Sequence, residues 1–141
     1  MRWTEHTLDA LARAGFRRGG ARTAVVELLG EQYCCLSVQE IHDGMRRAGR
    51  PVGIASVYRV IELLTELGLL QRVDVGDQAA RYEPAFPGGD HHHHVVCGDC
   101  GRVEPWKDDG LERAVDRVAG RVGYRIAGHD VVLRGVCADC G

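Results

Sequence analysis

The 141-residue sequence contains no apolar run close to the roughly 20 residues needed to cross a bilayer. Its first residues, MRWTEHTLDALARAGF, mix acidic and basic side chains with apolar ones, unlike a secretory signal. These two absences predict a cytoplasmic protein with no membrane partner. In a reducing cytoplasm, six cysteines are better explained as metal ligands than as disulfides, so a secreted disulfide scaffold is excluded.

The chain also has little net charge, −2, but this charge is unevenly distributed. Residues 1–72 carry ten basic side chains against eight acidic ones, and all ten are arginine, which suits bidentate contacts to phosphate and guanine. Residues 73–141 carry eight basic side chains against twelve acidic ones. The imbalance indicates two halves with different roles, although charge alone does not identify those roles.

Apolar residues at helical spacing dominate the first half, with glycines at or just after the ends of the periodic segments. An S-x-x-E capping box, Ser37 to Glu40, marks one helix start. The predicted helices cover residues 4–14, 21–30, a segment from Val38 onward, and 55–67. Two alternating segments, 69–75 and 79–84, flank a Gly76-Asp77 turn and predict a hairpin. Helices followed by a hairpin are typical of a winged helix-turn-helix, a DNA-binding architecture.

The second half follows a Pro/Gly segment, FPGGD at residues 86–90, which predicts a hinge. The elements predicted beyond it are strands at 91–97 and 101–106, a helix with an apolar stripe from Leu111 to Val122, and further strand over 124–136, interrupted at Gly128. About 50 residues are too few to bury a convincing core alone. This half is therefore expected to need a metal or a partner chain.

Four of the six cysteines form two C-x-x-C pairs, Cys97 with Cys100 and Cys137 with Cys140. A two-residue spacer lets both thiolates bind one ion, and two such pairs complete the tetrahedral coordination of a structural zinc without an open catalytic position. Two local disulfides or a redox-active pair are the alternatives. If zinc is bound, its loss should unfold this half of the chain.

Together these patterns predict an α+β protein in which two domains have separate tasks. The predicted organisation is a winged helix-turn-helix DNA-binding domain at residues 1–84, a hinge at 85–90, and a small α/β metal-binding dimerisation domain with the four-cysteine zinc site at 91–141.

Four consecutive histidines, His91 to His94, run directly into the first cysteine pair. An internal run without a linker is unlike a purification tag, whereas a disordered, metal-scavenging tract is an open alternative. Because side chains alternate along a strand, His91 and His93 would face one way and His92 and His94 the other, so one segment can serve two metal sites. Candidate further ligands are Cys34, Cys35, Glu83, Glu112 and His129.

The strings HHHHVVCGDCG and GIASVYRVIELLTELGLL, with the terminal C-x-x-C pair, resemble the ferric uptake regulator family of bacterial metal-dependent repressors, in the family's order and over nearly the whole chain. The resemblance implies a homodimeric, metal-activated repressor that binds palindromic, A/T-rich operator DNA and is not an enzyme with an organic substrate. The implied DNA-contacting residues are Arg22, Ser56, Tyr58 and Arg59. For Tyr58 and Arg59 an ordinary solvated helix face is the alternative.

The same resemblance implies two further metal sites besides the cysteine quartet. One would use His91, His93, Glu112 and His129. The other, which bridges the two domains, would use Cys35, Glu83, His92 and His94, since Cys35 stands where the family's iron branch has a histidine. The alternative for Cys34 and Cys35 is that they are buried small apolar residues. His6 and His42 are interpreted as ordinary helix residues.

The identity of the sensed metal is predicted from the donor atoms. Iron-type members of the family often have the motif H-H-D-H, with a carboxylate where this chain has His93. A run of imidazoles alone favours zinc. The histidine run resembles that of the zinc uptake regulators of high-GC bacteria. The expected function is zinc-responsive repression of metal-uptake genes. The alternatives are an iron- or peroxide-responsive regulator using Fe(II) or Mn(II), and a zinc storage or chaperone module that does not bind DNA. A zinc hydrolase is disfavoured because no H-E-x-x-H helix is present.

Overall fold

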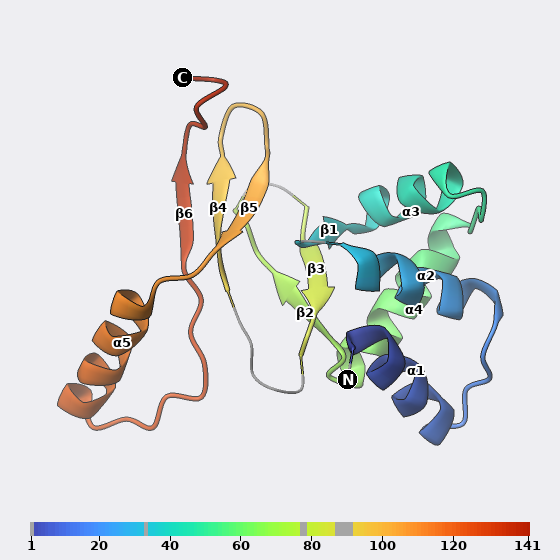
Figure 1. Ribbon diagram of the computed structural model, residues 1–141, viewed down its shortest axis with the longest axis horizontal. Helices are drawn as coiled ribbons and strands as arrows, with labels where there is room; N and C mark the ends of the chain where they lie inside the picture. Colours follow the sequence, from blue (N-terminus) through green and yellow to red (C-terminus); the bar gives the residue numbers. More distant parts are fainter. Residues whose placement is uncertain (1, 33, 77–78, 87–91) are drawn as a thin grey trace. The chain divides into compact units, whose positions relative to one another are not determined.

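The computed structural model describes residues 2–32, 34–76, 79–86 and 92–141 (Figure 1). The chain divides into two compact units, Met1–Asp90 and His91–Gly141. Both contain helices and a sheet, which confirms the predicted α+β class. Of the predicted hinge, only residues 85–86 lie within the described part, where they are irregular. No helix among the described residues is long and apolar enough to span a membrane.

The N-terminal unit is built from helices that share one core. They are α1 (Trp3–Arg13), α2 (Gly20–Glu31), α3 (Val38–Arg47) and α4 (Ile54–Glu66), each close to its predicted range. Most of the apolar residues at helical spacing lie in this core, and Val25, Leu29, Ile41 and Leu64 are fully buried. Ala12 and Leu67, which share the spacing on α1 and at the end of α4, are instead exposed, because each lies near the end of its helix. Burial of several such side chains, at about 1.5–3 kcal/mol each, fixes how α4 packs against α2 and α3.

The start of α3 is set by the predicted capping box. Ser37 Oγ accepts a hydrogen bond from the Glu40 N–H (3.1 Å), and the Ser37 N–H donates to Glu40 Oε1 (2.9 Å). Arg81 then pairs with the same Glu40 oxygen at 2.7 Å. The box therefore fixes the helix start and also links it to the strand that carries Arg81.

A small antiparallel sheet completes the N-terminal unit, in the order β1-β3-β2. Its strands are β1 (Leu36–Ser37), β2 (Leu70–Val73) and β3 (Arg81–Pro84). The hairpin strands are shorter than the predicted 69–75 and 79–84, and half of the predicted turn, Asp77, lies outside the described residues. β1 was not predicted, because two residues are too few to show alternation.

The second unit has a three-stranded sheet in the order β5-β4-β6. Its strands are β4 (His93–Cys97), β5 (Val103–Trp106) and β6 (Val132–Gly135). β6 is the last helix or strand among the described residues. β5 runs antiparallel and β6 parallel to β4, and Cys97 lies opposite Gly135. This register brings the end of β6, and the last cysteines with it, beside the first cysteine pair.

Helix α5 (Asp109–Val122) connects β5 to β6. Asp108 caps its start by accepting from the Leu111 N–H (3.0 Å), and Gly123 ends it with a φ of +73°, a left-handed conformation that favours glycine. No residue of α5 is buried. The predicted apolar stripe therefore exists on the helix, but the part of the chain that the structure describes does not bury it.

The prediction of strand over residues 124–136 is wrong for most of its length, because only Val132–Gly135 is a strand. Tyr124 is 73% exposed, and Ile126 is also exposed. Alternation indicates which side chains could share a face, but a strand also needs a hydrogen-bonding neighbour. Among the described residues no strand pairs with 124–130, and the Val131 carbonyl accepts a hydrogen bond from the His94 N–H (3.1 Å) directly before β6 begins. The strands predicted at 91–97 and 101–106 are likewise shortened, to the bounds of β4 and β5.

Candidate metal centres and nucleic-acid interface

The cysteine quartet lies at one end of the second unit's sheet. Cys97 ends β4, Cys100 lies in the turn after it, and Cys137 and Cys140 follow β6. All four sulfurs lie within 4.8 Å of one another, with no disulfide, and Cys100 Sγ and Cys137 Sγ are 3.9 Å apart. Zn–S bonds of about 2.3 Å at a tetrahedral angle place sulfurs about 3.8 Å apart. The donor set and its spacing fit a structural zinc.

Hydrogen bonds within the quartet shift the pKa values of Cys97 and Cys140 in opposite directions. The N–H groups of Cys100 (3.5 Å) and Cys137 (3.4 Å) donate to the Cys97 sulfur and lower its pKa to about 6. The thiols of Cys137 and Cys100 beside Cys140 raise the pKa of Cys140 to about 12. Without a cation, one thiolate is therefore favoured and ionisation of the last thiol is resisted. A dication bound at the centre would relieve that resistance.

A second cluster in the same unit joins β4, α5 and the segment before β6. Glu112 lies between two imidazoles, with Oε1 2.7 Å from His93 Nε2 and Oε2 2.7 Å from His129 Nε2. The Val131 N–H donates to His93 Nδ1 at 3.2 Å, and the His93 side chain is only 1% exposed. These two imidazoles and one carboxylate form a donor set suited to zinc. His91, which was predicted to complete it, lies outside the described residues.

Two other histidines of the run, His92 just before β4 and His94 within it, contact each other. The rings of His92 and His94 approach edge-on, with centroids 4.8 Å apart. His93 instead contacts Glu112 and lies 5.0 Å from the Trp106 ring. The run therefore presents its imidazoles in two directions.

A third group of donors lies in the N-terminal unit. Cys34 Sγ and Cys35 Sγ are 3.7 Å apart, and both lie within 4.8 Å of a carboxylate oxygen of Glu83. Cys35 is 4% exposed and Glu83 1%. The Cys34 thiol, burial and the nearby negative charge of Glu83 raise the pKa of Cys35 well above its usual value, and the Arg81 guanidinium opposes this only in part.

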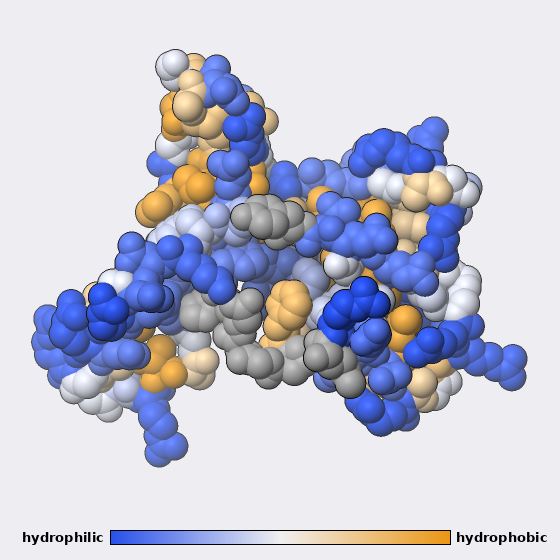
Figure 2. All heavy atoms as spheres, viewed as in Figure 1, coloured by the Kyte–Doolittle hydropathy of each residue, from blue (hydrophilic) through white to orange (hydrophobic). Residues whose placement is uncertain are grey.

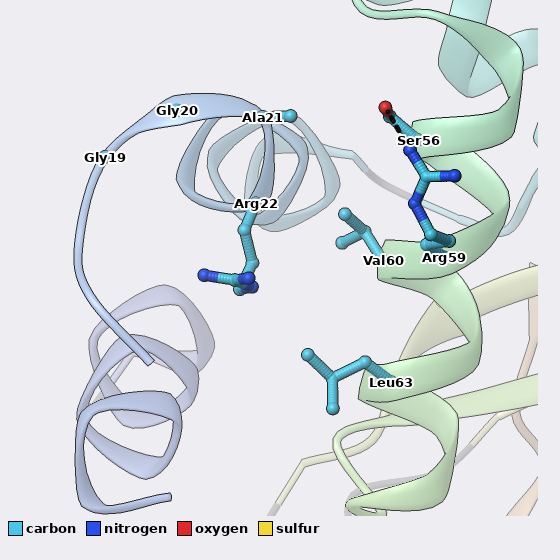
Figure 3. Close-up of a pocket in the computed structure, with 8 residues that line it drawn as sticks. All are labelled: Gly19, Gly20, Ala21, Arg22, Ser56, Arg59, Val60 and Leu63. Atoms are coloured by element: carbon cyan, nitrogen blue, oxygen red, sulfur yellow. Dashed lines mark hydrogen bonds between the residues drawn. The ribbon is translucent and has the colours of Figure 1, made fainter. Parts of the chain in front are cut away.

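The candidate DNA-contacting residues lie on α4 and at the start of α2. Tyr58 is 52% exposed, and Arg59 Nη2 donates to Ser56 Oγ at 3.0 Å along the helix surface. The Arg22 guanidinium lies over the Phe16 ring, 4.6 Å from its centroid. Figure 3 shows Arg22 extending from α2 into the space between the two helices and Arg59 lying along α4 toward Ser56. This space is an open cavity of about 430 Å³.

The fold and these sites can be compared with known proteins. The model of the "Ferric uptake regulator family" matches residues 13–134 of the chain. The chain belongs to the ferric uptake regulator family. The Ferric uptake regulation protein of Neisseria meningitidis serogroup A is 33% identical over 138 residues, which cover 96% of this chain and 93% of the relative.

Solved structures of the ferric uptake regulator family have the same fold. The Vibrio cholerae ferric uptake regulator matches with a TM-score of 0.81 at 28% identity, covering 92% of this chain and 98% of its own. The Helicobacter pylori regulator, described as having three functional metal binding sites, matches with a TM-score of 0.83 at 25% identity, covering 97% and 93%. The resemblance inferred from the sequence is confirmed, and family members are metal-responsive transcription regulators, not enzymes.

Two residues that support the N-terminal donors were not predicted from the sequence. Gln71 Nε2 donates to Glu83 Oε1 at 2.6 Å, and Arg81 Nη1 approaches the Cys35 carbonyl oxygen at 3.4 Å. Gln71 and Glu83 are register partners across β2 and β3. Working out the hairpin register would have placed Gln71 beside Glu83, but no sequence signal indicated the contact of Arg81.

Proposed function

We propose that this chain is a zinc-responsive repressor that acts in the cytoplasm as a homodimer on palindromic operators of metal-uptake genes. The observation that carries the proposal is the composition of its donor clusters, which are rich in thiols and imidazoles and poor in carboxylates. Thiolates and imidazoles favour zinc, whereas Fe(II) and Mn(II) take more carboxylate oxygens. The quartet is the structural site, and the other clusters are candidates for regulation.

DNA recognition is assigned to the first turns of α4. The exposed Tyr58 ring and the Arg59 guanidinium are free of the buried core, which suits contacts to a thymine methyl and to guanine or phosphate. Arg22 beside the cavity is suited to a backbone phosphate. A winged helix presents this helix to the major groove, and a two-fold dimer would address two half-sites.

Homodimer formation is assigned to the second unit. Apolar side chains are exposed on and around α5 and β6, and Figure 2 shows orange patches over the part of the molecule that contains them. The exposed set comprises Val118, Val122, Tyr124, Ile126, Leu133 and Val136. A unit with an uncovered apolar helix is expected to bury it against a second copy.

Metal response is assigned to a site that takes donors from both units. Cys35 and Glu83 precede residues 85–90, and His92 and His94 follow them. A metal that binds both sets would favour one domain arrangement over others, and only such a difference in affinity shifts the population toward the DNA-binding form. The cluster of His93, Glu112 and His129 lies within one unit and is proposed as the second, supporting site.

The first experiment selects DNA without assuming an operator. Purified protein is incubated with fragmented genomic DNA of its source under buffered zinc, anaerobic Fe(II), nickel or no added metal, and the retained fragments are sequenced. We expect zinc-dependent enrichment beside metal-transporter genes. The same enrichment with Fe(II) alone would overturn zinc as the signal, and no enrichment under any metal would favour a zinc storage or chaperone module.

The bridging site is tested by replacing both of its imidazoles. The double variant His92→Ala/His94→Ala should lose zinc-dependent operator binding, because metal bound in one unit alone does not restrain the other. The quartet zinc and the dimer should remain, as measured by metal analysis and sedimentation. His6→Ala, on α1, is the control and should respond as the wild type does. A double variant that still responds normally to zinc contradicts the bridging account.

A further inference from the structure

Cys34 and Cys35 are adjacent in the sequence, but only one of the two thiols belongs to a proposed metal site. Cys35 is assigned to the bridging site, but Cys34 has no assigned role. Its sulfur nevertheless lies 3.7 Å from the Cys35 sulfur and shares the same neighbourhood of Glu83. Adjacent cysteines need not direct their side chains to one point, since successive side chains in extended backbone diverge. Here they converge.

The spacing of this pair matches that of a metal-binding pair in the same molecule. The two sulfurs are 3.7 Å apart, against 3.9 Å between Cys100 and Cys137 in the quartet. Both values agree with the separation of about 3.8 Å that Zn–S bonds of 2.3 Å and a tetrahedral angle require. A disulfide is the less suitable product, because adjacent Cα atoms are only about 3.8 Å apart and disulfides usually span at least about 4.4 Å.

The third donor is fixed beside the thiol pair by the sheet. Glu83 on β3 is buried, and Gln71 holds one carboxylate oxygen at 2.6 Å. Arg81 lies between Glu40, at 2.7 Å, and the Cys35 carbonyl, at 3.4 Å, and so restrains the backbone that carries the thiols. All three donors belong to the N-terminal unit. Their convergence therefore does not depend on how the two units are arranged.

We propose that Cys34 and Cys35 both ligate the regulatory metal, with Glu83 as the third ligand from the same unit. Two thiolates and one carboxylate leave a tetrahedral ion one position for an imidazole of the histidine run. This inference rests on the proposed function, whose bridging set it changes by replacing one imidazole with Cys34. Two thiolates favour Zn(II) and Cd(II) and disfavour Mn(II) and Fe(II), so the pair determines which metal is sensed.

The test counts thiolates at the regulatory site with Co(II) in the full-length protein. The quartet is kept loaded with one equivalent of zinc, verified by metal analysis, and Co(II) is added to wild type, Cys34→Ser, Cys35→Ser and the double variant. Sulfur-to-cobalt charge-transfer absorption grows with the number of bound thiolates. Any band left in the double variant reports cobalt exchanged into the quartet and is subtracted.

Each single variant is expected to lose about half of the wild-type band. The zinc affinity of the regulatory site should fall at least about tenfold in Cys34→Ser, because loss of a residue that only hydrogen-bonds to a metal ligand already costs about 10–100-fold in affinity. The Mn(II) affinity of the same site should change little. Equal metal-free thermal unfolding of the variants establishes that serine leaves the fold intact. An unchanged band and zinc affinity in Cys34→Ser overturns the inference.

The outcome is separable from that of the proposed function. Halved bands without any zinc-dependent operator binding would support the two-thiolate site and reject the repressor. Normal zinc-dependent operator binding in Cys34→Ser, with an unchanged band, would support the repressor and reject Cys34 as a ligand.

Discussion

Arg59 on α4 is the side chain to which the proposed recognition of DNA assigns most specificity. Its guanidinium donates to Ser56 Oγ at 3.0 Å, so its orientation on the helix surface is already restricted. Arg59→Ala should weaken operator binding by about 1–3 kcal/mol, the range for one good bidentate contact to a base. Fluorescence anisotropy on operator and scrambled duplexes at several salt concentrations measures this loss and its sequence dependence.

The matched control is Arg2→Ala. Arg2 is also exposed, but it pairs with Glu5 at 3.2 Å, and the recognition helix does not contain it. Both variants remove one positive charge, so the general electrostatic loss is common to them. If Arg59→Ala weakens operator binding no more than Arg2→Ala does, the recognition role of Arg59 is rejected.

Individual residues were predictable where the chemistry is local in sequence. The quartet follows from two C-x-x-C spacings, because a knuckle of two intervening residues directs both sulfurs to one point. Glu112 and His129 were candidate ligands by residue type alone, and only the family resemblance assigned them to one site with His93, since no spacing rule brings a helix start and a loop 17 residues later to one histidine. Cys34 could not be assigned, because the bend that turns its sulfur toward Cys35 lies in a segment without periodicity.

At the scale of elements, the helix starts depend on caps that can be removed one at a time. Ser37→Ala deletes the oxygen that accepts from the Glu40 N–H at the start of α3. The free energy of unfolding should fall by about 1 kcal/mol, as for other serine caps. Urea denaturation monitored by circular dichroism measures it. Ser56→Ala, within α4, is the control, since Gly53 and not Ser56 caps that helix. Equal stability of the two variants would contradict the capping role.

Helices that show an apolar periodicity in their own sequence were predicted better than strands that depend on pairing with a neighbouring strand. The apolar stripe and terminal glycine place α1, α2 and α4 within one or two residues of the predicted ranges. β1 and the segment 124–131 were missed or misassigned for the opposite reason. A strand of two residues exists only because β3 lies beside it, and a longer alternating segment forms no strand where no partner is available.

At the scale of the whole molecule, the cysteine quartet links metal to assembly. β6 is a four-residue strand paired with β4, and α5 buries no residue, so the second unit has little core of its own. Zinc binding stabilises small domains by an apparent ~10 kcal/mol or more. We therefore expect the apolar face that is proposed to dimerise to depend on an ion that holds the end of β6 beside the end of β4.

Cys137→Ser should therefore remove the quartet zinc, unfold the second unit and abolish the dimer together. The winged-helix unit should keep its helices, because its core is separate and includes none of the quartet. Operator binding should then be lost even with Arg59 intact, since single half-site contacts lack the paired contribution of a dimer. Metal analysis, circular dichroism and sedimentation velocity measure the loss of zinc, of folded structure and of the dimer in one sample, and fluorescence anisotropy measures the loss of operator binding. Cys34→Ser is the control and should keep the quartet zinc and the dimer. A Cys137→Ser protein that lacks the quartet zinc and stays dimeric would show that the apolar face assembles without that ion.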